Sequence, residues 1–130
     1  MKIGNGVDIM KLCMNCFEPK GKCHCDYYCF VDIDDDFIEH IQLLNKKGYY
    51  TEYCCAGHID DIWFRPYITF KYKYKFKTLP KYFRWEERFD GLYYTVKWEE
   101  NNDMKWRQKI ATESRKALLD WIKELPINEE

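Results

Sequence analysis

The sequence lacks several features that define whole classes of protein. None of its apolar stretches approaches the roughly 18–20 consecutive residues that a membrane span requires, so we expect no membrane partner. The N-terminal residues Met-Lys-Ile-Gly-Asn-Gly contain no apolar core of a signal peptide. The chain also contains no glycine-rich dinucleotide fingerprint, no internal repeat and no low-complexity linker. These absences favour one domain in the cytoplasm.

A strong net charge is missing as well, because 21 basic residues balance 22 acidic ones. The distribution of charge along the chain is nevertheless uneven. Residues 26–39 include six acidic and no basic side chains, whereas residues 65–84 include seven basic and no acidic side chains. If both stretches are exposed in the folded protein, the surface is dipolar and its positive side attracts anions.

What the sequence does have is a concentration of cysteine near its start. Four of its seven cysteines form two short hooks, Cys-x2-Cys and Cys-x-Cys, and the segment between them contains a proline and a glycine that permit a chain reversal. Two such hooks can place four thiolates around one Zn²⁺ in a tetrahedron. We therefore predict a structural zinc site, an N-terminal zinc knuckle, with the ligands Cys13, Cys16, Cys23 and Cys25.

Three alternatives stay open for these thiols. His24 lies inside the second hook and could replace one of its sulfurs, and Cys29 could also substitute, although its surroundings are typical of a strand with a buried thiol. Disulfides suit the sequence less well, because the number of cysteines is odd and metal ligation indicates a reducing interior. The thiols could also cluster without binding a metal.

Hydrophobic periodicity predicts helices at two places. An acidic start at Asp34-Asp35-Asp36 and apolar residues at helical spacing indicate a helix over residues 35–47 that stops at Gly48. The aspartates are expected to cap its free N–H groups. A second helix is expected from residue 102 or 103 onward, with an apolar stripe formed by Trp106, Ile110, Ala117, Leu118, Trp121 and Leu125.

The remaining pattern is that of strands. β-branched and aromatic residues predict strands at 27–33, 48–55 and 67–77. Asp90-Gly91 predicts a type I′ hairpin that pairs Trp85 with Val96, and residues 1–12 carry no strong pattern. The fold class is therefore α+β, an antiparallel sheet of about four to five strands with two helices on one face. The zinc knuckle, residues 1–28, is expected to pack on this body, residues 29–126.

The segment Cys54-Cys55-Ala56-Gly57-His58 is a candidate functional loop. Successive strand residues point to opposite faces, so only one of the two thiols can share a site with the histidine. Cys55 and His58 are spaced like half of a metal site, and they also resemble a thiol nucleophile with an imidazole base. The alternative is a buried cysteine beside a surface histidine. We predict ligand contacts from Cys55, Gly57 and His58.

Alternation over residues 67–77 places a row of lysines on one face of the predicted strand. Lys71, Lys73 and Lys75, with Arg65 nearby, could hold the phosphates of a nucleotide or nucleic acid, and neighbouring tyrosines could stack on bases. The alternative is an edge strand, on which lysines discourage aggregation without binding anything.

Residues 31–58 resemble the motif of the wybutosine-synthesis tRNA methyltransferase family. That family has an acidic start, a helix ending in Ile/Leu-Asn, a strand containing Tyr-Thr, and Ser-Cys-Ser-Gly-Arg. The corresponding residues here are Leu44-Asn45, Tyr50-Thr51 and residues 54–58, with alanine in place of the second serine and histidine in place of the arginine. The resemblance implies a similar strand–turn–strand piece and a ligand loop.

Together these observations predict a small intracellular, zinc-stabilised binding protein for a nucleotide-like or nucleic-acid ligand, with no catalytic residue assigned. Its compactness and lone zinc knuckle also resemble the accessory proteins that phages deploy against host machinery, which implies a host protein or a signalling nucleotide as partner. Two other functions stay open. One is a tRNA-modifying enzyme related to the methyltransferases, with Arg65 or His58 near a cofactor. The other is an interaction domain that binds another protein.

Overall fold

The structure, a computed structural model, describes residues 9–25, 30–58, 64–98 and 103–129. Within these ranges the chain forms the strands β1 (Ile9–Cys13), β2 (Phe30–Asp34), β3 (Thr51–Cys55), β4 (Tyr67–Phe70), β5 (Phe83–Glu86) and β6 (Gly91–Tyr94). The helices are α1 (Ile38–Lys46) and α2 (Met104–Glu124), with short 3₁₀ turns η1 (Lys20–Lys22) and η2 (Asp35–Phe37). No helix in these ranges is long and apolar enough to cross a membrane.

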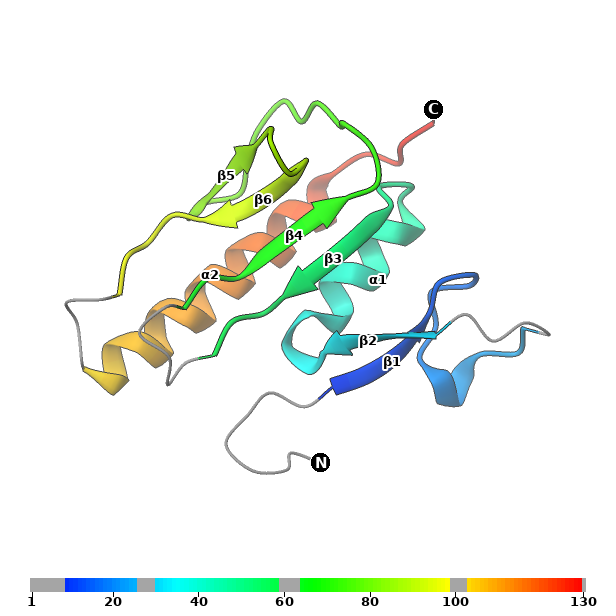
Figure 1. Cartoon of the computed structure of the whole chain (residues 1–130), viewed down its shortest axis with the longest axis horizontal. Helices are drawn as coiled ribbons and strands as arrows, with labels where there is room; N and C mark the ends of the chain where they lie inside the picture. The colour runs from blue at the N-terminus through cyan, green and yellow to red at the C-terminus, as the bar shows by residue number, and fades with distance from the viewer. Residues whose placement is uncertain (1–8, 26–29, 59–63, 99–102, 130) are drawn as a thin grey trace.

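The strands form two antiparallel sheets. β1 pairs with β2, and the other four strands form a sheet in the order β3-β4-β6-β5. Figure 1 shows both helices behind this four-stranded sheet, so they cover one of its faces and leave the other toward the viewer. The predicted α+β class with antiparallel strands and two helices is confirmed, whereas the described strands divide into four and two instead of forming one sheet.

Both predicted helices are present. η2 and α1 occupy most of the predicted range, and Gly48 follows α1 with a φ of +91°, the left-handed stop that the sequence indicates. Asp103 caps α2, because its side chain accepts the backbone N–H of Lys105 at 3.0 Å. The face that α2 buries is displaced from the predicted stripe, and its buried residues are Arg107, Ala111, Ser114, Leu118, Trp121 and Ile122.

The aspartates before α1 do not have the predicted capping role. η2 and α1 begin without a side-chain cap. Instead, the Asp34 carboxylate accepts the backbone N–H of Ala56 at 2.7 Å, and Asp36 forms an ion pair with Arg115 of α2 at 3.2 Å. These carboxylates connect the start of the helix to the end of β3 and to α2.

The N-terminal segment is more ordered than the sequence indicates. Residues 9–12 of the segment predicted to carry no strong pattern form β1 together with Cys13, and β1 pairs with β2 from Ile9 opposite Asp34 to Cys13 opposite Phe30. β2 is confirmed over residues 30–33 of its predicted range, while residues 27–29 lie outside the described part of the chain. The proposed division after residue 28 stays a prediction.

The predicted strand over residues 67–77 is wrong beyond Phe70. β4 lies between β3 and β6, and its last pairings join Phe70 to Thr51 and Thr69 to Gly91. Past these residues the Lys71 N–H still bonds the Tyr50 carbonyl at 3.0 Å, but residues 72–77 have no partner strand to keep them extended. β4 is therefore a central strand, and the lysines do not protect an exposed edge.

The predicted hairpin exists with a different register. Trp85 pairs with Leu92, not with Val96, and Phe83 pairs with Tyr94. The turn comprises residues 87–90 and is not a two-residue type I′ turn, because Asp90 has a positive φ of 51° whereas Gly91 begins β6. The observed register of β5 and β6 therefore differs from the predicted one, because Trp85 lies opposite Leu92.

Gly91 is required for close packing, and not for a positive φ. An ideal Cβ on Gly91 would lie 2.6 Å from the Ile68 carbonyl oxygen and 3.0 Å from the Cα atom of Thr69. Gly91→Val should therefore force β4 and β6 apart and lower the free energy of unfolding by about 1–3 kcal/mol or more. Urea unfolding measures this loss. Gly21→Val is the matched control, because nothing lies within 4 Å of its Cβ position. Equal stability of both variants would contradict the β4–β6 pairing.

Two apolar clusters hold these elements together. The larger one lies between the four-stranded sheet and the helices, and it also receives Leu12 of β1 and Ile33 of β2. The smaller one consists of Phe64, Trp98 and Ala111, with partly buried neighbours around them. Both β1 and β2 are therefore attached to the main core, beside the cysteine hooks.

Candidate functional site

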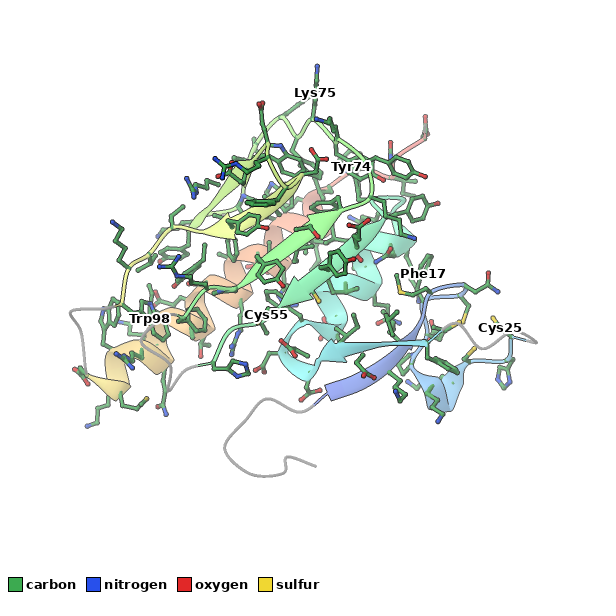
Figure 2. The ribbon with its side chains drawn as sticks, viewed as in Figure 1. Phe17, Cys25, Cys55, Tyr74, Lys75 and Trp98 are labelled. Atoms are coloured by element: carbon green, nitrogen blue, oxygen red, sulfur yellow. The ribbon has the colours of Figure 1, made fainter. Side chains whose placement is uncertain are left out.

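The four predicted metal ligands converge. The sulfur atoms of the described cysteines Cys13, Cys16, Cys23 and Cys25 all lie within 4.8 Å of one another. The Sγ atoms of Cys13 and Cys25 are 4.0 Å apart. Tetrahedral coordination with metal–sulfur bonds of about 2.3 Å places sulfur atoms about 3.8 Å apart, so the arrangement needs only a small contraction to hold an ion. Figure 2 shows Cys25 on the side of the molecule that bears the β1–β2 sheet.

Local backbone contacts form the first hook. β1 ends at Cys13, and the chain turns so that the N–H of Phe17 bonds the Cys13 carbonyl at 2.8 Å and the Cys13 N–H bonds the Glu18 carbonyl at 2.9 Å. Phe17 has a φ of +62°, a left-handed conformation that costs a non-glycine residue about 1–2 kcal/mol. The turn that presents two sulfurs is therefore strained and must be held by its surroundings.

The second hook follows η1. The backbone N–H of Cys23 donates to the Pro19 carbonyl at 3.1 Å. Outside the hooks, Glu18 forms an ion pair with Lys46 of α1 at 2.6 Å. Because both side chains are partly exposed, this pair contributes only a few tenths of a kcal/mol to about 1 kcal/mol. The pairing of β1 with β2 and the burial of Leu12 in the main core are therefore the main attachment of the cysteine hooks to the rest of the fold.

Hydrogen bonds to sulfur prepare the cluster for thiolates. The Cys13 sulfur accepts the backbone N–H of Asn15 at 3.4 Å, and the Cys25 sulfur accepts the side-chain amide of Asn15 at 3.3 Å. A backbone hydrogen bond from Cys16 lowers the pKa of Cys13 to about 7. The Cys25 N–H also favours the Cys23 thiolate, but burial and the neighbouring sulfurs outweigh it and raise the pKa of Cys23 to about 12. A bound cation removes this mutual repulsion.

The alternatives for this cluster are less favoured. His24 is exposed and its ring nitrogens are not among the converging ligand atoms. The six cysteines that the structure describes are all free thiols, so no disulfide competes for the sulfurs in this part of the chain. Cys29 lies outside the described residues. The geometry is compatible with a metal site of four sulfur ligands.

The loop after β3 is anchored to the rest of the fold. Cys54 packs against the main core, whereas Cys55 points to the opposite face of the sheet, as alternation predicts. Asp34 holds the Ala56 N–H, and Arg115 donates to the Ala56 carbonyl at 2.9 Å. Gly57 has a φ of +81°, and an ideal Cβ there would lie 2.7 Å from the Phe64 ring. The close approach of Phe64 and the positive φ therefore explain why glycine stands at position 57.

The thiols of this loop are not activated. Burial raises the pKa of Cys54 to about 12, and burial also raises the pKa of Cys55. The Cys55 sulfur accepts the Gly57 N–H at 3.4 Å, while His58 is exposed. A nucleophile needs a thiolate and a base within hydrogen-bond reach, and this geometry favours neither condition. Asp60 and Asp61, the carboxylates that follow in sequence, lie outside the described residues.

The lysines after β4 form an exposed basic segment, defined here as residues 71–77. Lys71, Lys73 and Lys75 are exposed, whereas Tyr74 and Phe76 between them pack against the main core. The Tyr74 hydroxyl donates to the Gly48 carbonyl and accepts the Tyr50 N–H, and the Phe76 ring lies 5.0 Å from the Trp121 ring. From Lys73 onward the alternation of the sequence is kept as alternating burial without a strand, whereas Tyr72 is exposed.

The predicted ligand residues separate into two groups. β3 and β4 are antiparallel, with Cys55 opposite Tyr67 and Thr51 opposite Phe70. Cys55 thus lies at one end of the pair and the basic segment begins at the other, about 13 Å away along the strand. Figure 2 shows Cys55 and Lys75 far apart across the sheet. Exposed Arg65 precedes β4 at the Cys55 end. A compact ligand cannot contact both groups.

Sequence reasoning missed the face of the sheet that the helices leave open. Its outward residues include Tyr67, Tyr93 and Tyr53, which come from three adjacent strands. Phe89, from the β5–β6 turn, joins them, and its ring is 5.8 Å from that of Tyr93. Period-two alternation within β4 and β6 was the available signal, but only the register shows which aromatic residues meet.

Comparison with known proteins adds no relative. No protein-family model, no curated protein and no solved structure matches the chain. The resemblance of residues 31–58 to the tRNA methyltransferases therefore stays a prediction.

Proposed function

We propose that this protein is a zinc-stabilised binding protein of the cytoplasm that holds an anionic ligand, a nucleotide or a nucleic acid, at its basic segment. The observation that carries the proposal is the presentation of Lys71, Lys73 and Lys75, which are exposed on a backbone that partly buried Tyr74 and Phe76 anchor against the core. Charges held on an anchored segment lose less conformational freedom on binding than charges on a free loop.

Zinc is the ion that suits the cysteine cluster best. Four soft sulfur ligands within 4.8 Å of one another select zinc over the hard cations, which prefer oxygen ligands. Because four protein ligands complete the coordination, no position is left for water or substrate, and the role of the ion is structural. Free thiols poised for metal also suit a reducing compartment.

Phosphate is the anionic group that the basic segment suits best. Lys73 makes a long contact of 4.0 Å with Asp90, and its side chain is 81% exposed, so this pair leaves the ammonium group available to a ligand. The clustering of basic residues over positions 65–84, without an acidic residue, keeps neighbouring carboxylates of the same stretch from neutralising them. Several ammonium groups in one line match successive phosphates.

The lysines are tested by Lys71→Gln, Lys73→Gln and Lys75→Gln combined, with fluorescence anisotropy of a labelled oligonucleotide over a range of salt concentrations. We expect weaker binding, and a plot of log affinity against log salt whose slope is smaller by about 2, since each phosphate contact on a single strand contributes about 0.7. Thermal stability should not change, because all three side chains are exposed.

A matched control makes the same change in net charge on α2. Lys105→Gln, Lys109→Gln and Lys123→Gln combined alters three exposed lysines of the helix, and oligonucleotide affinity should stay at the parental value. If the variant of the basic segment binds like this control, the segment has no role in binding and the proposed function is overturned. The affinity of a His58→Ala variant tests separately whether the far end of β3 contributes to binding.

A further inference from the structure

The open face of the four-stranded sheet carries aromatic rings that the core does not use. Tyr67 of β4 and Tyr93 of β6 are paired neighbours whose rings are 5.5 Å apart and nearly parallel, with an interplanar angle of 9°. Tyr53 of β3 is 65% exposed, and Phe89 beyond β6 is 52% exposed. Exposed rings gathered on one rigid surface are typical of a binding site.

These rings surround a shallow hollow of about 460 Å³. Its lining includes Tyr53 and Tyr67 on one side and Phe89 and Tyr93 on the other. Lys71 and Arg88 also line it, and Lys71 is the first lysine of the basic segment. The aromatic surface is therefore continuous with the positive segment.

We infer that the open sheet face binds a single-stranded nucleic acid, whose bases stack on these aromatic rings while Lys71, Lys73 and Arg88 contact its phosphates. This inference rests on the proposed function and specifies the ligand and the surface. Base–aromatic stacking tolerates any sequence, because every base has a π-face. The helices occupy the opposite side of the sheet, so a strand can lie across the open face without clashing with them (Figure 1).

The charges of the face favour a path for the phosphates. Glu52 and Asp90 line the hollow, Glu86 of β5 lies on the same face near Tyr93, and Asp90 lies 4.0 Å from Lys73. The carboxylate of Glu52 repels phosphate at the β3 side, so the backbone of the strand should run on the side of Lys71 and Arg88. The bases then point toward the tyrosines. The Arg88 guanidinium lies 5.8 Å from the Phe89 ring centroid, so at this end a cation and a ring stand side by side, as a chain with adjacent phosphates and bases requires.

A single strand suits this surface better than a duplex or a mononucleotide. In a duplex the base faces are stacked on each other and unavailable to protein rings. A mononucleotide offers one base, whereas the rings come from three strands and a turn. A row of lysines after β4 likewise suits several phosphates.

The test measures anisotropy of a fluorescein-labelled 12-mer of uridine with the zinc-loaded full chain. Tyr53→Leu and Phe89→Leu should each weaken binding about fivefold or more, because a leucine keeps apolar contact but loses stacking. Tyr53→Phe and Phe89→Tyr keep a ring and should bind within about twofold of the parent. Both positions are more than half exposed, so the variants should keep the parental melting temperature.

The outcomes separate this inference from the proposed function. If the leucine variants bind as the parent does while the lysine variant of the basic segment loses affinity, the stacking surface is overturned and the proposed function stands. The same conclusion follows if a duplex of equal length, or uridine monophosphate alone, binds as tightly as the 12-mer. Failure of the parent to bind the 12-mer in low salt overturns it.

Discussion

Cys16→Ser should release the metal ion and loosen β1 and β2, while the four-stranded sheet and both helices stay folded. Serine is a poor ligand for zinc, and three thiolates leave the coordination incomplete. In small zinc domains the apparent binding free energy of the ion, about 10–16 kcal/mol near pH 7, contributes to folding. We expect the ion to hold the strained turn at Phe17 and the second hook, which follows a 3₁₀ turn with no buried residue.

The body should survive because most of its core lies outside residues 1–28. Ile68, Leu92 and Leu118 are fully buried between the sheet and α2. Leu12 and Ile33 belong to the same core, so its melting temperature should fall without complete unfolding. Elemental analysis measures the metal, and amide hydrogen exchange measures the loss of protection in β1 and β2.

Cys55→Ser is the matched control, because it makes the same substitution outside the cluster and should leave the metal in place. If freshly purified parent protein contains no metal, or if Cys16→Ser retains a full equivalent, the zinc site is refuted. A third result, unfolding of the whole chain on loss of the ion, would show that the body and the knuckle form one cooperative unit.

Features that depend on neighbours in sequence were predictable. The two cysteine hooks follow from short spacing, since a tight turn places sulfurs two or three residues apart at one point, and the structure brings them together. The helices follow from their apolar periodicity, from the Asp103 cap and from the stop at Gly48. In each case a few adjacent residues contain the whole signal.

Features that depend on distant residues were not predictable. Residues 67–77 do alternate in sequence, but a strand persists only while a partner strand offers hydrogen bonds. β3 begins opposite Phe70 and β6 begins opposite Thr69, so neither strand pairs with the residues that follow. Asp90-Gly91 indicated a tight turn, yet Gly91 is needed inside the sheet, where Ile68 leaves no space for a side chain. Tertiary contact overrode the local turn preference.

The candidate binding surface shows the same division. The lysines are adjacent in sequence and were found, whereas the aromatic face joins side chains from β3, β4 and β6 and appears only when their register is known. Asp34 and Asp36 illustrate the converse. Both have a local capping signal, but Ala56 and Arg115 offer stronger, partly buried partners, so the carboxylates bind those groups instead.

The smaller core cluster is expected to control the stability of the loop that contains Cys55 and Gly57. Trp98 is 1% exposed and stacks on Phe64 with ring centroids 4.0 Å apart and an interplanar angle of 4°. Phe64 in turn contacts Gly57 closely and lies 5.6 Å from the guanidinium of Arg115. A chain of contacts therefore runs from Trp98 to the loop.

Trp98→Ala should lower the free energy of unfolding by about 3–5 kcal/mol, since it removes a fully buried indole and leaves a cavity beside Phe64. Trp98→Phe keeps a ring on Phe64 and should cost less than half as much. Urea unfolding measures both, and amide exchange of Ala56 and Gly57 should accelerate in the alanine variant. Their N–H groups bond Asp34 and Cys55, so faster exchange reports the loop directly. If the alanine variant is as stable as the parent, the smaller cluster does not contribute to stability. The position of the loop must then depend on other contacts.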